Sequence, residues 1–277
     1  GYLLITIKKQ QKVKKPTKRC ELPHISYSEL KNWCHCPYYH KLVNIDKIKH
    51  FEGNEYTAFG TALHSFCEHL LTKQITVNDK AFFIKEFRQE LKSLDKDLNK
   101  KLVVSMFEQG KKIVPELIPA LAKVFGDYQV FTTEEKLYEP LGEIENYLFK
   151  GYVDLVLKTK DGKYHIIDWK TCSWGWGAKK RSDKMIAYQL VLYKHYFCKK
   201  HNIDPKNVET HFALLKRTAK KDIVEVFSVT SGIKRTENAL ELLQRAIETI
   251  KSGVHIKNKL SCTSGYGCEF YKTQYCT

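Results

Sequence analysis

The stretch GYVDLVLKTKDGKYHIIDWKT, residues 151–171, decides the fold and raises the first question about this chain. Two apolar runs, each typical of a strand buried on at least one face, flank an Asp-Gly turn signal. Each run nevertheless contains an aspartate, Asp154 in the first and Asp168 in the second, and Lys170 follows two residues later. The pattern predicts a β-hairpin that carries a polar cluster within an otherwise apolar sheet.

The length of the turn decides whether the two aspartates meet, because side chains on a strand alternate between its faces. A two-residue turn at 161–162 would put the two carboxylates on opposite faces. A three-residue loop over 160–162 pairs Asp154 with Asp168, and Gly162 suits the left-handed position that such a loop requires. We predict the three-residue loop, with a positive φ at Gly162.

Two adjacent carboxylates on a sheet repel each other, and burying them unpaired is costly unless a cation lies between them. Oxygen ligands favour Mg²⁺ or Mn²⁺. Lys170 could hold a phosphate oxygen or orient a water, which together with the metal would suit hydrolysis of a phosphodiester. The alternative is an Asp–Lys ion pair on a solvated hairpin face. The apolar flanks YVDLVL and HIIDW favour a half-buried site.

Composition is that of a globular chain of 277 residues, and no apolar run approaches the length of a membrane span. The net charge of +16 favours a polyanionic partner, most simply nucleic acid, although a solvated lysine-rich surface is the alternative. The basic run KKQQKVKKPTKR, residues 8–19, predicts an arm that contacts phosphates or a solvated tail. Nine cysteines without a secretion signal predict an intracellular location, cytoplasmic by default, with an organelle or a phage-infected cell as open alternatives.

The order of expected elements predicts an α/β fold with a helical insertion before the sheet. A capping box, Ser26 with Glu29, predicts a first helix. Gly110 and Pro115 are expected to interrupt the helix over 102–125, and Ser182 or Asp183 to begin the helix over 182–201. The sequence contains no Walker-type phosphate loop. Further helices are expected over 57–71, 78–98, 102–125, 182–201 and 235–253, and strands over 128–140, 144–158, 163–171, 208–218 and 222–230.

Four stretches together resemble the PD-(D/E)XK nuclease superfamily. They are SYSELKNWCHCPYYH, FGTALHSFCEH, the hairpin with Asp154, Asp168 and Lys170, and AYQLVLY, and they extend from about residue 26 to 196. More specifically they resemble the branch that includes the bacterial recombination nucleases RecB and AddB, the CRISPR-associated adaptation nucleases and the mitochondrial genome maintenance exonuclease. The resemblance implies a restriction-endonuclease-like core, in which a central mixed sheet is flanked by helices.

The resemblance also implies roles for individual residues. His64, Asp154 and Asp168 would be side-chain ligands of Mg²⁺ or Mn²⁺, and the carbonyl of Trp169 a further ligand. Lys170 would position and activate the attacking water. On the next helix, Gln189 and Tyr193 would steady the substrate or Lys170. Glu135, on the preceding strand, is a candidate outer-shell acid. For His64, Gln189 and Tyr193 the alternative is an ordinary place on an amphipathic helix.

The C-terminal cysteines resemble a further feature of this branch, a four-iron cluster held by one N-terminal and three C-terminal cysteines. Cys36, with Cys34 as a substitute, would join Cys262, Cys268 and Cys276. Their spacing, C-x5-C-x7-C, departs from the usual C-x2-C-x5-C. The alternatives are zinc or a set of free buried thiols.

These observations predict a metal-dependent DNA nuclease, with an exonuclease acting on single strands or DNA ends as the first hypothesis. A structure-selective endonuclease on the same fold and a non-catalytic nucleic-acid-binding module are the alternatives. No membrane partner is expected. We predict a basic arm over 1–20 and one nuclease domain over 21–277. Within that domain we expect a helical arch at about 57–126, a catalytic sheet core at about 128–253 and a cysteine-bearing tail over 254–277.

Overall fold

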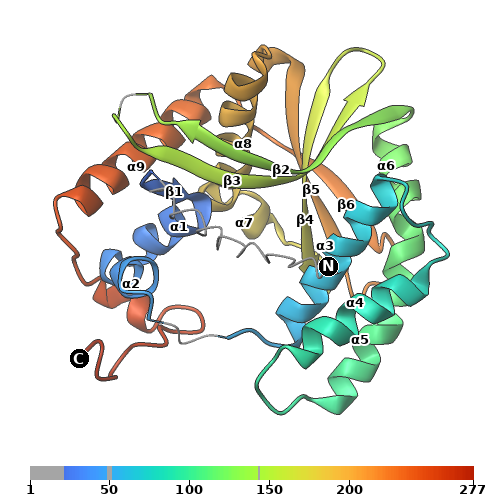
Figure 1. Ribbon diagram of the computed structural model, residues 1–277, viewed down its shortest axis with the longest axis horizontal. Coiled ribbons are helices and arrows are strands. Elements are labelled where there is room, and N and C mark those ends of the chain that lie inside the picture. The colour runs from blue at the N-terminus through green and yellow to red at the C-terminus, as the bar shows by residue number, and fades with distance from the viewer. Residues whose placement is uncertain (1–21, 49–51, 143) are drawn as a thin grey trace, which may run out of the picture.

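The computed structural model describes residues 22–48, 52–142 and 144–277. Within these residues, a mixed sheet of six strands is covered by helices on both faces (Figure 1). The predicted basic arm falls outside them. The strands are β1 (His24–Ser26), β2 (Tyr128–Pro140), β3 (Leu148–Thr159), β4 (Tyr164–Cys172), β5 (Val208–Lys216) and β6 (Val224–Val229). The α-helices are α1 (Tyr27–His35), α2 (Pro37–His40), α3 (Glu55–Leu71), α4 (Lys80–Lys92), α5 (Lys100–Ile113), α6 (Leu117–Phe125), α7 (Ala178–Arg181), α8 (Lys184–His201) and α9 (Ile233–Lys251). Short 3₁₀ or π turns are η1 (Lys41–Ile45), η2 (Val114–Glu116), η3 (Pro205–Asn207) and η4 (Lys259–Cys262).

The sheet has the order β1-β3-β4-β5-β6, with β2 paired along the other edge of β3. β1 is parallel to β3 and β4 is parallel to β5, whereas the β2–β3, β3–β4 and β5–β6 pairs are antiparallel. The predicted α/β class with a mixed central sheet and a helical insertion is therefore confirmed. The sequence did not predict β1, a strand of three residues that is too short to show a periodic pattern.

The central hairpin adopts the predicted register. Leu155 pairs with Ile167 and Leu157 with His165, which places Asp154 opposite Asp168 at the end of the paired segment. Gly162 has a φ of +83°, as the three-residue loop requires.

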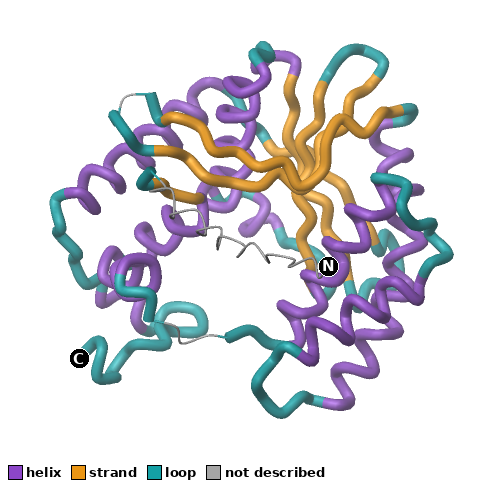
Figure 2. Tube along the Cα trace, viewed as in Figure 1, coloured by secondary structure: helices purple, strands orange, loops and turns teal. Residues whose placement is uncertain are grey.

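Two hydrophobic cores lie on the two faces of the sheet. Side chains of α1, α8 and α9 pack against one face, where Phe149 stacks on Tyr196 with ring centroids 4.4 Å apart. Helices α3 to α6 pack against the other face around a cluster of phenylalanines that includes Phe59 and Phe87. Figure 2 shows the strands between these two groups of helices. Successive side chains of β3 and β4 point to opposite faces of the sheet and pack into both cores. Because both faces are buried, the two strands are nearly continuous apolar runs in the sequence.

Local signals set most helix boundaries. The Ser26–Glu29 capping box is present, and Asp183 rather than Ser182 caps α8. The expected interruption of the helix over 102–125 occurs only around Pro115, between α5 and α6, because proline lacks the N–H that an α-helix needs. Gly110 lies inside α5, so the prediction of a break there was wrong. Of the described helices, none has the length and apolar character needed to span a bilayer.

Candidate active site

The central strands separate in the middle of the sheet. On one edge of β3, β1 pairs with residues 148–150 and β4 with residues 155–158, so residues 151–154 lie between the two paired stretches. β4 continues past this point along β5 as far as Cys172. Figure 1 shows the resulting divergence of β2 and β3 from β4, β5 and β6. Polar side chains can therefore occupy the centre of an apolar sheet, at the point where the hairpin opens.

Asp154 lies in this opening and contacts two neighbouring elements. Its Oδ2 accepts a hydrogen bond of 2.8 Å from the backbone N–H of Trp169, and its Oδ1 lies 3.6 Å from Nδ1 of His64 on α3. The N–H and C=O of one residue in a strand point to the same side, so the Trp169 carbonyl faces the same opening. Burial disfavours the charged imidazole of His64, but the carboxylates of Asp154 and Asp168 outweigh it, so the pKa of His64 is raised.

Glu134 on β2 provides the third group of this cluster. One ligand atom from each of His64, Glu134 and Asp154 lies within 4.8 Å of the other two. Glu134 has a φ of +46°, which is uncommon for a residue with a side chain, and β2 contains a bulge between Val130 and Thr132. Burial, together with the charge of Asp154, raises the pKa of Glu134 to about 7.

Glu135, the acid proposed for this strand, lies elsewhere. Its Oε1 lies 2.9 Å from the ammonium of Lys200 and also contacts the imidazole of His201, both on α8. The β2–β3 register puts Glu134 opposite Asp154, because its neighbours Thr133 and Glu135 pair with Leu155 and Val153. The stretch TTEEK shows that two acids are adjacent in a strand, but it does not show which of them faces Asp154.

Asp168 and Lys170 form the second half of the site on β4. The Lys170 ammonium lies 2.6 Å from Oδ2 of Asp168, whose side chain is 4% exposed. This contact is an ion pair rather than a well-directed hydrogen bond, and among the described residues Oδ2 has no hydrogen-bond donor. Burial raises the pKa of Asp168, Asp154 adds to this effect, and Lys170 opposes it.

Helix α8 supports Asp168 from the other side. The Gln189 side-chain amide donates to Oδ1 of Asp168 at 3.0 Å and to the hydroxyl of Tyr193 at 3.3 Å. Burial and the charge of Asp168 raise the pKa of Tyr193, so its hydroxyl stays protonated. The four-residue spacing of Gln189 and Tyr193 puts both side chains on the helix face that meets the opening.

The donor set fits a divalent cation. Two carboxylates and an imidazole converge, the buried carboxylate of Asp168 interacts with Asp154 and His64, and burial together with the charge of Asp154 raises the pKa of Glu134. Hard oxygen ligands with one imidazole are suited to Mg²⁺ or Mn²⁺, and a bound cation would remove the repulsion.

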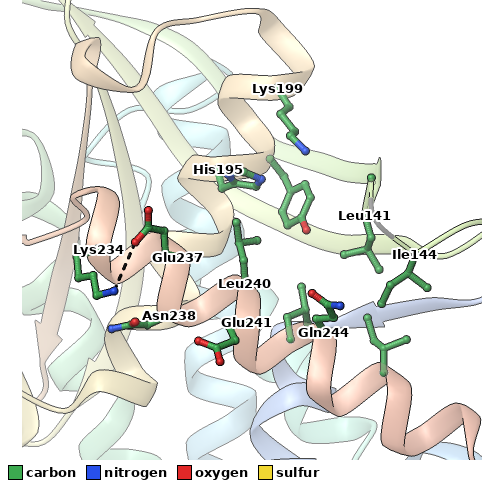
Figure 3. A pocket seen from close by; sticks show the side chains of 14 residues that line it. Leu141, Ile144, His195, Lys199, Lys234, Glu237, Asn238, Leu240, Glu241 and Gln244 are labelled. Carbon is green, nitrogen blue, oxygen red and sulfur yellow. Dashed lines mark ion pairs between the residues drawn. The ribbon is translucent and has the colours of Figure 1, made fainter.

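The cavity in Figure 3 is a different place. It has a volume of about 530 Å³ and is lined by α8, α9 and the segment after β2, including His195, Lys199 and Leu240. Its charged pair, Lys234 with Glu237, lies on the exposed side of α9. None of the residues around Asp154 lines it, so the cavity volume does not indicate the catalytic centre.

The C-terminal tail folds back onto the N-terminal helices. The backbone N–H of Asn258 donates to Sγ of Cys36 at 3.3 Å. Burial and the nearby Cys262 and Cys276 raise the pKa of Cys268. In the described part of the chain, the groups with ligand atoms within 4.8 Å of one another contain no cysteine. A four-iron cluster spaces its thiolates around a larger core than a single ion does, so the cluster stays a prediction.

Comparison with known proteins gives a consistent result. No curated protein sequence matches the chain. A solved structure of a proposed exonuclease from Eubacterium rectale has a similar fold, with a TM-score of 0.58 and 12% identity over 87% of this chain and 86% of that one. A second structure, of the protein SSO0001, has a TM-score of 0.33 and 14% identity over 76% of this chain and 84% of that one, too low a score to support an argument. A family model described as the PD-(D/E)XK nuclease superfamily matches residues 24–276. Nearly the whole described chain is covered by that match, and the chain therefore belongs to the PD-(D/E)XK nuclease superfamily, whose enzymes hydrolyse nucleic acids and typically use divalent metal ions.

Proposed function

We propose that this chain is a metal-dependent deoxyribonuclease, and that it acts as an exonuclease on single-stranded DNA or on DNA ends. The observation that supports this most directly is the opening between β3 and β4, into which three different elements place Asp154, Asp168, Lys170 and His64. A non-catalytic binding module would have no need to bury two carboxylates beside each other.

His64, Glu134 and Asp154 would hold a Mg²⁺ or Mn²⁺ ion, with Asp168 and the Trp169 carbonyl as further ligands. When bound, such an ion activates water and neutralises charge on the phosphodiester. Glu134 must lose its proton before it can act as a ligand, because its pKa lies near 7 in the free protein.

Lys170 would position the attacking water and stabilise the charge that develops on the phosphate oxygens. Its ammonium is held by Asp168, and Asp168 is in turn oriented by Gln189. Gln189 and Tyr193 are positioning residues in this scheme, since their contacts reach Asp168 and not the reacting atoms directly.

The choice of a nucleic acid as substrate rests on charge and on the place of the site, and the choice of DNA rests on the resemblance of the four sequence stretches to DNA nucleases. A net charge of +16 would provide many phosphate contacts and a steep salt dependence of binding. The site lies between the sheet and the helical layer α3 to α6, because His64 belongs to α3 and Asp154 to β3. A strand threaded beneath that layer would reach the carboxylates end first, which favours an exonuclease.

End-labelled single- and double-stranded DNA, incubated with and without Mg²⁺ or Mn²⁺, tests this proposal. We expect metal-dependent release of short products from linear single strands and no cutting of circular single-stranded DNA. Cutting of the circle would identify an endonuclease instead. Binding without any metal-dependent cleavage, for DNA and for RNA of the same sequence, would contradict the enzyme proposal.

The cysteine cluster is tested independently of cleavage. We expect anaerobically purified protein to be brown, with visible absorbance and bound iron that are lost when Cys36 or Cys268 is replaced by serine. Zinc in place of iron, or neither metal, would contradict the iron–sulfur prediction.

A further inference from the structure

A second group of metal-ligand side chains lies at the start of β4 and β5. His165 is on β4, and Glu209 and His211 are on β5. The parallel register pairs His165 with Glu209, and His211 is two residues further along, on the same face. One ligand atom from each of the three lies within 4.8 Å of the other two. We propose that His165, Glu209 and His211 bind a transition-metal ion of the Zn²⁺ class, separate from the catalytic cation.

The distances suit a single ion. Nδ1 of His165 lies 3.1 Å from Nε2 of His211 and 3.6 Å from Oε2 of Glu209. Ligand atoms at about 2.0–2.1 Å from a tetrahedral ion are roughly 3.3–3.4 Å apart. The two measured separations lie on either side of that value.

The surrounding hydrogen bonds aim the ligand atoms at one point. The Thr159 hydroxyl donates its only proton to Asp161 at 2.5 Å, so it accepts from Nε2–H of His165 at 3.0 Å. This leaves Nδ1 of His165 without a proton and facing the other ligands. Lys163 holds Oε1 of Glu209 at 2.6 Å and leaves Oε2 for the centre. Metal-binding imidazoles and carboxylates are commonly oriented by such contacts.

The rival explanation is a hydrogen-bonded pair of histidines. A single proton on Nε2 of His211 could bridge to Nδ1 of His165, but it would leave Oε2 of Glu209 facing a lone pair at 3.6 Å. An ion would be shared by Nδ1 of His165, Nε2 of His211 and Oε2 of Glu209, while the buried Nδ1 of His211 has no hydrogen-bond partner among the described residues.

The site has access to solvent and lies apart from the opening at Asp154. Phe125, the last residue of α6, packs on both imidazoles at centroid distances of 4.8 and 5.0 Å. A cavity of about 370 Å³, lined by Phe125, His165 and Thr159, would supply water as the fourth ligand. His165 precedes Asp168 on β4 by three residues, and its ring faces α6, whereas Asp168 contacts α8. The ion would join the beginnings of β4 and β5 and so stabilise the turn end of the β3–β4 hairpin, opposite the open end that holds Asp154 and Asp168.

Zn²⁺ and Co²⁺ binding to the full chain test the proposal. The protein variant Asp154→Asn, which weakens the catalytic site, is titrated with Zn²⁺ in excess Mg²⁺ and separately with Co²⁺, whose visible absorption reports tetrahedral coordination. We expect one Zn²⁺ per chain and a tetrahedral Co²⁺ spectrum. Adding Glu209→Gln should weaken Zn²⁺ binding at least tenfold, and adding His211→Asn should abolish the Co²⁺ spectrum.

His195→Asn in the same background is the matched control, since His195 is also a partly buried histidine with a lowered pKa but lies in the cavity of Figure 3. It should bind Zn²⁺ as the parent does. Because Glu209 is half-buried and lies at the edge of the cluster, Glu209→Gln is expected to fold even if His211→Asn does not. Equal Zn²⁺ affinity in the parent and in Glu209→Gln, or no Zn²⁺ binding by the parent, would overturn the proposal.

Discussion

Replacing Glu134 with glutamine should change how the affinity for Mn²⁺ depends on pH. Glu134 lies in the group with His64 and Asp154, and burial together with Asp154 raises its pKa to about 7. A protonated carboxyl group cannot be a metal ligand, so binding must release this proton at lower pH. The affinity of the natural protein therefore rises with pH through the pKa of Glu134.

The size of the effect follows from that pKa. With a pKa of about 7, roughly a tenth of Glu134 is ionised at pH 6 and roughly nine-tenths at pH 8. Glu134 alone should therefore lower the apparent Mn²⁺ affinity about tenfold, or ~1.4 kcal/mol, between pH 8 and pH 6. Glu134→Gln loses this part of the pH dependence, while His64 and Asp168 titrate in both proteins. The variant should bind Mn²⁺ more weakly than the natural protein at pH 8. The ratio of the two affinities should be about tenfold smaller at pH 6 than at pH 8.

Calorimetric titration of Mn²⁺ at pH 6 and pH 8 measures both affinities, and the Mn²⁺ concentration for half-maximal DNA cleavage provides a second readout. Glu135→Gln is the matched control, because Glu135 is adjacent in sequence but is paired with Lys200 and His201. It should keep the pH dependence of the natural protein, even if its stability falls. The reasoning is refuted if Glu134→Gln retains the full pH dependence or if Glu135→Gln loses it.

Three further predictions concern catalysis, packing and binding. Lys170→Met should abolish cleavage, because among the described residues Lys170 is the only cation that contacts Asp168. It should leave DNA affinity within a few-fold of the natural value in a binding assay with Ca²⁺, because Lys170 is one of many cations in the chain. Residual cleavage above a tenth of the natural rate would contradict this role. Gly151→Ala should lower the free energy of unfolding by about 1–3 kcal/mol and slow cleavage, since its Cβ would lie 2.8 Å from the ring of Tyr193. The control Gly177→Ala, with no atom within 4 Å of its Cβ, should leave stability and rate unchanged in denaturant titration and cleavage assays, and equal effects of both changes would contradict the packing argument. Deleting residues 8–19, which contain seven lysines and arginines, should reduce the slope of log affinity against log salt by up to about 5 for single-stranded DNA, and an unchanged slope would show that this run makes no phosphate contact.

The sequence was sufficient where the information is local. The three-residue turn and its glycine predict the hairpin register, because side-chain alternation makes a shift of one residue incompatible with the apolar pattern. Capping residues predict the start of α1 in the same way, and Pro115 predicts the break between α5 and α6. The four stretches between residues 26 and 196, taken together, indicated the superfamily to which the chain belongs.

Tertiary structure alone decided which neighbouring groups meet. Whether Glu134 or Glu135 joins Asp154 depends on the register of β2 against β3, which a bulge between Val130 and Thr132 shifts and which the sequence does not show. The opening beside Asp154 exists because β1 and β4 share one edge of β3, and the sequence did not reveal β1. His165 meets His211, 46 residues away, only through the parallel register of β4 and β5. Turn geometry and periodicity are properties of a short segment and can be read along the chain, whereas strand order and contacts between distant segments arise only when the whole sheet is packed.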